Sequence, residues 1–295
     1  MRSLRPGQKC EVWIASANSQ RNLIYASENM LLEAPNWTLD GQALILNGAG
    51  KLWRLGLADG SLAEVPLTRV PDLNNDHVLA PDRSTMFLSG EDGHIYCAPL
   101  KGGAATRITD DDGSFHFLHG IIPDGGCLAY VDIEGGDFTR PGRLRIIPAA
   151  GGPARSVDVG EGHCDGPEYS PDGDWLYLNT ESFSTAAGHA QLARVRTDGS
   201  GFERLADTAS VGWFPHLSPD GRLASYLRFP AGTQGHPADL PVEVVLVSTS
   251  DWTAPLHTWP VFGGQGTLNV NSWSPDCQRF AYVAYPLESP ATGGY

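Results

Sequence analysis

The sequence has little basic charge and few cysteines. Its 20 Lys and Arg residues stand against 34 Asp and Glu residues, which gives a formal net charge of −14. Because phosphate binding needs a basic surface, this balance excludes nucleic acid as an expected partner. The 5 cysteines form no C-x-x-C pair and are odd in number. They are therefore interpreted as reduced thiols, either buried or incidental.

Long apolar runs are also missing. No stretch approaches the roughly 18 apolar residues of a membrane-spanning helix, so no membrane insertion is expected. The first residues, MRSLRPGQKCEVW, are basic but lack the apolar region of a secretory signal. A cytoplasmic location is expected on this ground, or a periplasmic one if a leader has been removed.

Several catalytic motifs are absent as well. The sequence contains no G-x-S-x-G, the strand-to-helix turn that carries a nucleophilic serine, which excludes a peptidase of the prolyl-oligopeptidase type. Neither G-x-G-x-x-G nor G-x-x-x-x-G-K-[ST] occurs between a strand and a helix. Nucleotide chemistry therefore has no support.

Six similar units are present along the whole chain. In each unit an apolar run ends in a tight turn with an aspartate, and a second β-rich run follows, as in EYSPDGDWLYL and HLSPDGRLASY. Strand-type units with a period of roughly 40 to 50 residues are typical of a β-propeller. The turn aspartates are Asp40, Asp82, Asp124, Asp172, Asp220 and Asp276.

The repeats predict an all-β fold, a single six-bladed β-propeller over residues 1–295 with four antiparallel strands in each blade. The last repeat is short, whereas two β-rich runs, EVWIAS and NLIYAS, precede the first repeat. Pairing these N-terminal strands with the C-terminal ones would complete the last blade and leave no open edge. The expected blades span about 30–70, 74–110, 115–159, 164–206 and 211–259, and the sixth combines about 266–286 with 11–27.

The S-P-D units resemble the WD40-like repeats of the TolB C-terminal propeller. They read YSPDG at 169–173, LSPDG at 217–221 and WSPDC at 273–277. The flanking motifs, such as DGPEYSPDG at 165–173 and GGQGTLNVNSWSPD at 263–276, are similar to one branch of bacterial TolB-like propellers. The resemblance extends over nearly the whole chain and implies a propeller that serves as a binding or scaffold module.

Polar residues recur a few positions before the turn aspartates, where they fall on the innermost strand of each blade. We expect them at one height along the central channel, as an arc around one mouth, with strand alternation deciding which of them face inward. The amides of GGQGTLNV are expected at the same mouth. The ligand-binding candidates are Asp76, His77, His119, Asp165, Glu168, His216, Gln265 and Asn269.

The longer repeats must contain insertions, and the best places for them are the loops that follow the second strand of a blade. These loops lie on the same face as the entry to the first strand, so we expect them to rim this mouth. Polar loops over a fixed scaffold are where binding sites usually lie. His236 is the loop histidine of most interest, and Arg140, Arg143 and Arg228 could receive carboxylates. The expected loops are 133–143, 180–190 and 229–242.

The histidines and the glutamate of the arc suit a divalent transition metal such as Zn, Mn, Fe or Ni. Two alternatives stay open, namely a metal-free ligand site and a polar channel whose side chains satisfy only one another and ordered water. The sequence does not identify a cofactor. The candidate metal ligands are His77, His119, His216 and Glu168.

A run of three aspartates and a glycine, Asp110 to Gly113, is reminiscent of a calcium loop. It lacks the later glutamate and the glycine position of such loops. It is therefore interpreted as a polar turn.

Two classes of function remain. In the first, the propeller binds a small molecule, including a saccharide, or a protein at its mouth. In the second, it is a carbohydrate-active lyase or hydrolase, similar to oligogalacturonate lyase, a propeller enzyme with a His-rich metal site. That resemblance implies a metal that neutralises a uronate carboxylate, a histidine base, and Gln265 beside the three histidines as a candidate ligand. A locally positive mouth would favour uronates, and a uniformly acidic one would exclude them.

Overall fold

Short β-strands separated by tight turns make up almost the whole protein. The computed structural model describes residues 2–287; residue 1 and residues 288–295, which the predicted single domain also includes, lie outside the described residues. Residues 2–287 form 25 strands and one short 3-10 helix, η1 (Glu134–Gly136). No helix within this range is long and apolar enough to cross a membrane.

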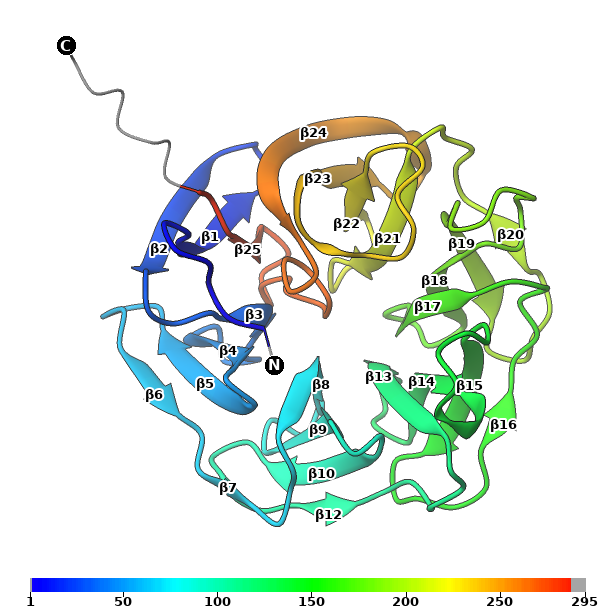
Figure 1. Ribbon diagram of the computed structural model, residues 1–295, viewed down its shortest axis with the longest axis horizontal. Helices are drawn as coiled ribbons and strands as arrows, with labels where there is room; N and C mark the ends of the chain where they lie inside the picture. The colour runs from blue at the N-terminus through cyan, green and yellow to red at the C-terminus, as the bar shows by residue number, and fades with distance from the viewer. Residues whose placement is uncertain (1, 288–295) are drawn as a thin grey trace.

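The strands form sheets that stand side by side around a ring, with the first strand of each blade nearest the centre (Figure 1). Neighbouring strands within a blade are antiparallel. The first three blades contain, in turn, β3 (Glu33–Trp37), β4 (Ala43–Gly48), β5 (Lys51–Gly56) and β6 (Leu62–Glu64); β8 (Leu73–Leu79), β9 (Thr85–Gly90), β10 (Ile95–Pro99) and β12 (Thr106–Arg107); and β13 (Phe115–Ile121), β14 (Cys127–Ile133), β15 (Arg143–Pro148) and β16 (Arg155–Ser156).

Blades 4 and 5 continue the ring in the same order. A short parallel pair, β7 (Leu67–Thr68) with β11 (Gly103–Ala104), links the outer parts of blades 1 and 2. The strands of blades 4 and 5 are β17 (Cys164–Tyr169), β18 (Trp175–Thr180), β19 (Gln191–Arg196) and β20 (Glu203–Arg204), followed by β21 (Val211–Leu217), β22 (Leu223–Phe229), β23 (Ala238–Ser248) and β24 (Asp251–Gly264).

The sixth blade combines the two ends of the chain. β25 (Arg279–Ala284) pairs with β1 (Cys10–Ser16), and β1 pairs with β2 (Arg21–Ser27). The innermost position is taken by the segment through Trp273, which forms a β-bridge with Phe280. The predicted closure by N-terminal strands is therefore confirmed, and the fold is an all-β six-bladed propeller.

Hydrophobic side chains are buried between neighbouring blades. The described residues form six clusters, and each cluster lies mainly between the facing sheets of two adjacent blades. Between blades 2 and 3, for example, Phe87 and Ile95 pack with Leu118 and Tyr130. Because each sheet is covered on both faces, the ring stability is distributed over six similar interfaces.

A hydroxyl group and an aspartate brace the turn after the first strand. In blade 5, Ser218 Oγ donates to Asp220 Oδ1 at 2.6 Å and accepts the N–H of Leu223 at 3.0 Å. Blades 2 and 3 have Ala80 and Ile122 at this place. The brace is therefore the physical reason for the S-P-D repeat. The same arrangement occurs at Thr38, Ser170 and Ser274.

We expect Ser218→Ala to lower the free energy of unfolding by about 1–2 kcal/mol, because it removes two hydrogen bonds at a buried position. Ser200→Ala is the matched control, since Ser200 donates to Asp198 at 2.7 Å in an exposed turn. The control substitution should lower the free energy of unfolding by less than about 0.5 kcal/mol. Urea denaturation measures both, and equal losses in the two variants would contradict the brace.

Candidate functional site

The inner strands of blades 1 to 5 are irregular near their middle. Each of them loses register with its neighbouring strand, which is the mark of a β-bulge. A bulge bends the strand and changes the direction of the side chains that follow it. Residues adjacent in sequence therefore face different parts of the channel. The breaks lie between Glu33 and Asn36, Leu73 and His77, Leu118 and Gly120, Asp165 and Glu168, and Trp213 and His216.

Three of these bulges have the same backbone feature. Ala34, Gly166 and Phe214 have φ angles of 52°, 61° and 55°, and each precedes a proline. Such a left-handed conformation is strained for Phe214, so its surroundings must hold it in place. The side-chain oxygen of Asn179 does so by accepting the N–H of Phe214 at 3.1 Å. The strained residue lines the cavity at the channel mouth.

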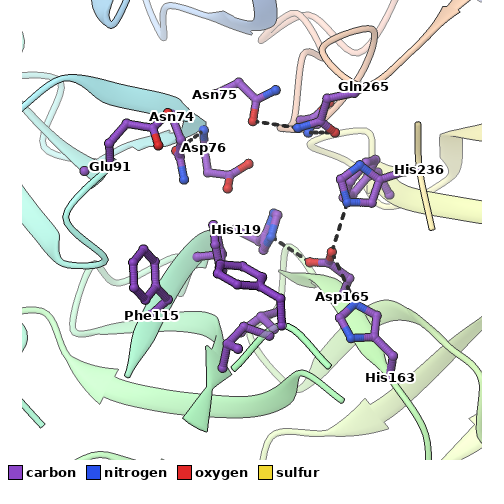
Figure 2. A pocket seen from close by; sticks show the side chains of 17 residues that line it. Asn74, Asn75, Asp76, Glu91, Phe115, His119, His163, Asp165, His236 and Gln265 are labelled. Atoms are coloured by element: carbon purple, nitrogen blue, oxygen red, sulfur yellow. Dashed lines mark hydrogen bonds and ion pairs between the residues drawn. The ribbon is translucent and has the colours of Figure 1, made fainter. Parts of the chain in front are cut away.

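This channel-mouth cavity has a volume of about 400 Å³. Inner-strand residues contribute to its lining, as does Ile133 at the end of β14, while Phe138 comes from the loop after β14 and His236 from the loop after β22. Two of the three predicted loops therefore contribute to the rim. Figure 2 shows the polar side chains around the opening. The labelled ones are Asn74, Asn75, Asp76, Glu91, His119, His163, Asp165, His236 and Gln265. Asn269 also lines the cavity.

Asp165 holds together the polar wall of the cavity (Figure 2). Its Oδ1 lies 2.9 Å from Nε2 of His119, and its Oδ2 lies 3.5 Å from Nε2 of His236 and 3.7 Å from Nε2 of His163. Nδ1 of His163 accepts the N–H of Gly142 at 2.8 Å, so the ring proton lies on Nε2, toward the carboxylate. One carboxylate thus orients histidines from three successive blades.

The charges of this group depend on one another. Burial alone would lower the pKa of His119, but Asp76 and Asp165 raise it to about 9. Burial would raise the pKa of Asp165, but His119 and the hydrogen bonds from the three histidines hold it well below its ordinary value. Near neutral pH the wall therefore contains a His119 imidazolium beside the Asp165 carboxylate.

Asp76 lies across from this group and has an unsatisfied oxygen (Figure 2). The residue is 5% exposed, and its Oδ1 has no hydrogen-bond partner among residues 2–287. Burial raises the pKa of Asp76 to about 6, although His119 acts in the opposite direction. Nδ1 of His119 likewise has no partner within the described part of the chain. Two buried polar atoms of cavity-lining residues thus have no hydrogen-bond partner among residues 2–287.

Amide groups form another side of the cavity. Gln265 Nε2 donates to Asn75 Oδ1 at 3.2 Å, and Asn269 Nδ2 donates to Gln265 Oε1 at 3.2 Å. Asn269 Oδ1 accepts the N–H of Gly266 at 2.8 Å. Gly266 has a φ of 85°, which glycine adopts without steric strain. The glycine-rich motif therefore shapes the turn that places both amides in the lining.

Glu168 and His216 form a separate pair of buried polar side chains. Glu168 Oε2 is 2.5 Å from His216 Nδ1, and Glu168 Oε1 accepts Asn271 Nδ2 at 2.7 Å. His216 Nε2 donates to the carbonyl of Leu268 at 3.1 Å. Glu168 and Asn271 line a second cavity of about 340 Å³, beside the Pro-Asp turns. The predicted polar residues are thus divided between two cavities, and His119 lines both of them.

His77 is fully buried, and its Nδ1 donates to Asn47 Oδ1 of blade 1 at 2.6 Å. Burial lowers the pKa of His77 to about 4, so its ring is neutral. The structure does not bring His77 together with His119, His216 and Glu168 as one set of metal ligands. Among the described residues, the ligand atoms of three His, Cys, Asp or Glu side chains lie within 4.8 Å of one another only at Asp112, His116 and Asp132.

Several residues that line the cavity were not among the site residues predicted from the sequence. Phe115 and Phe117 share a face of β13 with His119, so the pattern F-x-F-x-H could have revealed them by its period of two. His163 precedes the predicted strand of blade 4, and only its closeness to Asp165 in the sequence could have indicated it. Phe138 lies in a predicted rim loop.

The arginines expected beside the mouth do not reach the cavity. Arg140 Nη1 lies 2.7 Å from Glu134, and Arg228 Nη2 lies 2.6 Å from Glu243. Arg143 is likewise outside the lining. No Lys or Arg among residues 2–287 lines the channel-mouth cavity, so no such side chain is placed to receive a uronate carboxylate.

Known proteins with similar sequences or structures identify the family of the chain. No family model matches it. An uncharacterized protein of Agrobacterium fabrum is 39% identical over 264 residues, which cover 88% of this chain and 86% of that protein. A solved structure from Agrobacterium tumefaciens, provisionally assigned as TolB, has a TM-score of 0.85 at 36% identity and covers 95% of this chain and 99% of that one. TolB from Acinetobacter baumannii has a TM-score of 0.66 at 18% identity, over 88% of this chain and 65% of that one.

The chain therefore belongs to the family of TolB-like six-bladed β-propellers. The TolB-like fold supports a binding or scaffold module. Oligogalacturonate lyase in complex with manganese is a more distant neighbour, with a TM-score of 0.53 at 13% identity over 78% of this chain and 64% of that one. At such identities the likeness shows the fold alone.

The folded-state pKa of His119 is raised from 6.5 to about 9, so its charge contributes stability that is complete below pH 6.5 and is lost as the pH rises through about 9. Between about pH 6.5 and 9.5, we expect the free energy of unfolding of the wild type to fall by roughly 2–3 kcal/mol more than that of His119→Gln. Urea denaturation across this range gives the two curves. Parallel curves would show that His119 does not titrate in this window.

Asp76→Asn should raise the free energy of unfolding at pH 7 by roughly 1–3 kcal/mol, because it removes a buried carboxylate. In the folded wild type the pKa of Asp76 is raised from 3.8 to about 6. The destabilisation caused by ionising this carboxyl group is therefore small near pH 4 and complete above about pH 6. The two proteins should therefore be nearly equal at pH 4. Denaturant titrations at both pH values test this, and a variant no more stable than wild type at pH 7 would refute it.

Proposed function

We propose that this propeller is a binding module whose channel-mouth cavity takes a small neutral polar molecule, with saccharides as the favoured class. The observation that carries the proposal is a pair of buried polar atoms without a partner among the described residues, Asp76 Oδ1 and His119 Nδ1, in side chains that line one cavity. The cavity of about 400 Å³ falls within the range of roughly 300–1,000 Å³ that is usual for small-molecule sites.

The polar lining suits hydroxyl groups. The carboxylates of Asp76 and Asp165 accept hydrogen bonds, whereas the amides of Gln265 and Asn269 both donate and accept. The hydrogen bonds between these amides and Asn75 fix their orientation before a ligand arrives. A preformed arrangement of this kind lowers the entropy lost on binding.

An aromatic wall offers an apolar face to the same ligand. The rings of Phe115 and Phe117 have centroids 5.5 and 6.1 Å from that of Phe138. Phe138 is 65% exposed at the rim, which is unusual for so large an apolar side chain without a partner. A sugar ring could rest its C–H face on this wall while its hydroxyls reach the polar side.

The charge of the lining favours a neutral ligand over a uronate. Asp76, Glu91 and Asp165 are acidic, and the charge of His119 is already paired with Asp165 at 2.9 Å. A uronate would bring a further negative charge next to them without a free cation to receive it. The lyase alternative also lacks a converging set of metal ligands at this mouth among the described residues.

A binding screen with matched saccharides tests the proposal. Oligomers of galactose and of galacturonate differ in the carboxylate, and both are titrated into wild type by calorimetry. We expect the neutral oligomer to bind and the uronate to bind at least about tenfold more weakly, a difference of about 1.4 kcal/mol. Phe138→Ala should weaken binding, whereas Leu256→Ala, which removes an exposed apolar side chain outside the cavity lining, should not.

Three outcomes would overturn the proposal. Binding of the uronate alone would reverse the charge argument and favour the lyase alternative. Equal weakening by Phe138→Ala and Leu256→Ala would place the ligand elsewhere. Failure of every neutral saccharide in a panel that also includes gluco- and manno-configured oligomers would remove the saccharide class.

A further inference from the structure

A second polar cluster lies on blade 3, outside the channel-mouth cavity. Phe115 and Phe117 face that cavity, so His116 between them projects from the opposite face of β13. His116 pairs across the sheet with Asp132 on β14. Its Nε2 lies 3.4 Å from Oδ1 of Asp132 and 3.4 Å from Oδ1 of Asp112, in the loop before β13. Two strands and a loop thus bring three potential ligands together.

The hydrogen bonding of His116 leaves one ring nitrogen directed at the carboxylates. Nδ1 lies 2.9 Å from the carbonyl oxygen of Gly93, which can only accept, so Nδ1 is the donor. In the neutral ring, Nε2 then presents its lone pair to Asp112 and Asp132. A histidine that donates one N–H to a backbone carbonyl while the other nitrogen faces acidic groups is the usual arrangement of a metal ligand.

The distances fit an ion at the centre of the cluster. A charge-assisted N–H···O contact measures about 2.7–2.9 Å, and both separations here are longer. Ligand atoms about 2.1 Å from a tetrahedral ion lie about 3.4 Å from one another. The ligand atoms of the three residues all lie within 4.8 Å of one another. The cluster is therefore of the size that an ion at its centre requires.

An unsatisfied oxygen points to the same conclusion. Asp132 is 5% exposed, and its Oδ1 has no hydrogen-bond partner from any described residue. Arg145 lies 3.8 Å from the other oxygen, Oδ2, and so leaves Oδ1 free toward His116. A buried carboxylate oxygen without a donor is costly unless a cation occupies the space beside it.

We propose that Asp112, His116 and Asp132 bind a divalent first-row transition-metal ion, with zinc and manganese as the ions to test. One imidazole and two carboxylates suit such ions, whereas calcium and magnesium prefer oxygen ligands alone. Two carboxylates also balance the charge of a divalent ion. His116 is 2% exposed, but the side chain of Asp112 is half exposed, so the ion can enter from solvent and keep a water ligand on that side.

The site would have a structural role. Asp112 belongs to the loop that leads into β13, while His116 and Asp132 belong to the first two strands of the blade. An ion would tie the loop to the sheet and stabilise the folded state by mass action. This inference is independent of the ligand proposed for the channel-mouth cavity.

The test uses the full chain after removal of metals with a chelator. Elemental analysis after incubation with zinc or manganese and desalting should give one ion per chain, and the same ion should raise the Tm. Asp112→Asn keeps the acceptor for the Ser114 N–H but removes the charge, and it should weaken binding about tenfold or more. Asp111→Asn is the matched control, with the same charge change in the same loop, and should bind as wild type does.

Other results would overturn the proposal. Wild type that takes up neither ion, or equal weakening in Asp112→Asn and Asp111→Asn, would exclude a specific site. Loss of uptake in Asp165→Asn, with Asp112→Asn unaffected, would assign the ion to the channel-mouth cavity instead. Asp112 is on the surface, so its variant is expected to fold even if Asp132→Asn does not, and circular dichroism of each variant checks this.

Discussion

The pairing of β1 with β25 is the contact on which the rest of the ring depends. Residues Glu11–Ser16 pair with Arg279–Ala284, and this joins the two ends of the chain and leaves no open edge. The N-terminal segment adds polar contacts, since Arg2 donates to Asp239 and to the carbonyl of Gln265, both at 2.8 Å. Because Gln265 also lines the channel-mouth cavity, the N-terminal segment that helps to close the ring also contacts a residue of the mouth.

The features predictable from the sequence are those with local causes. The brace of Ser218 and Asp220 connects residues two apart, so it appears directly as a repeated motif. The number of repeats gives the number of blades, and a count of strands at the two ends gives the closure. The polar residues of the inner strands were also identifiable, because Asp76, His119 and Asp165 each lie a few positions before the turn aspartate of their repeat.

The direction of each side chain could not be predicted, because it depends on the bulges. Asp76 and His77 are neighbours, yet Asp76 faces the cavity and His77 donates to Asn47 in the interface between blades. In blades 4 and 5 a proline follows the left-handed residue and could have marked the bulge. β8 has no proline there, so nothing in its sequence distinguishes a regular strand from a broken one. A shift of one residue in the register of a strand moves its side chains to the opposite faces of the sheet.

Strand β13 links the two sites. Phe115 and His119 face the channel-mouth cavity, while His116 on the other face contacts Gly93 of blade 2 and lies opposite Asp132. An ion held by His116 would restrain the start of β13, and with it the aromatic rim, without touching a ligand in the cavity. Such restraint lowers the ordering cost of ligand binding, and linkage then requires the ligand to strengthen metal binding by the same factor. If an ion binds there, the alternation of one strand would couple the proposed metal site to the mouth of the propeller.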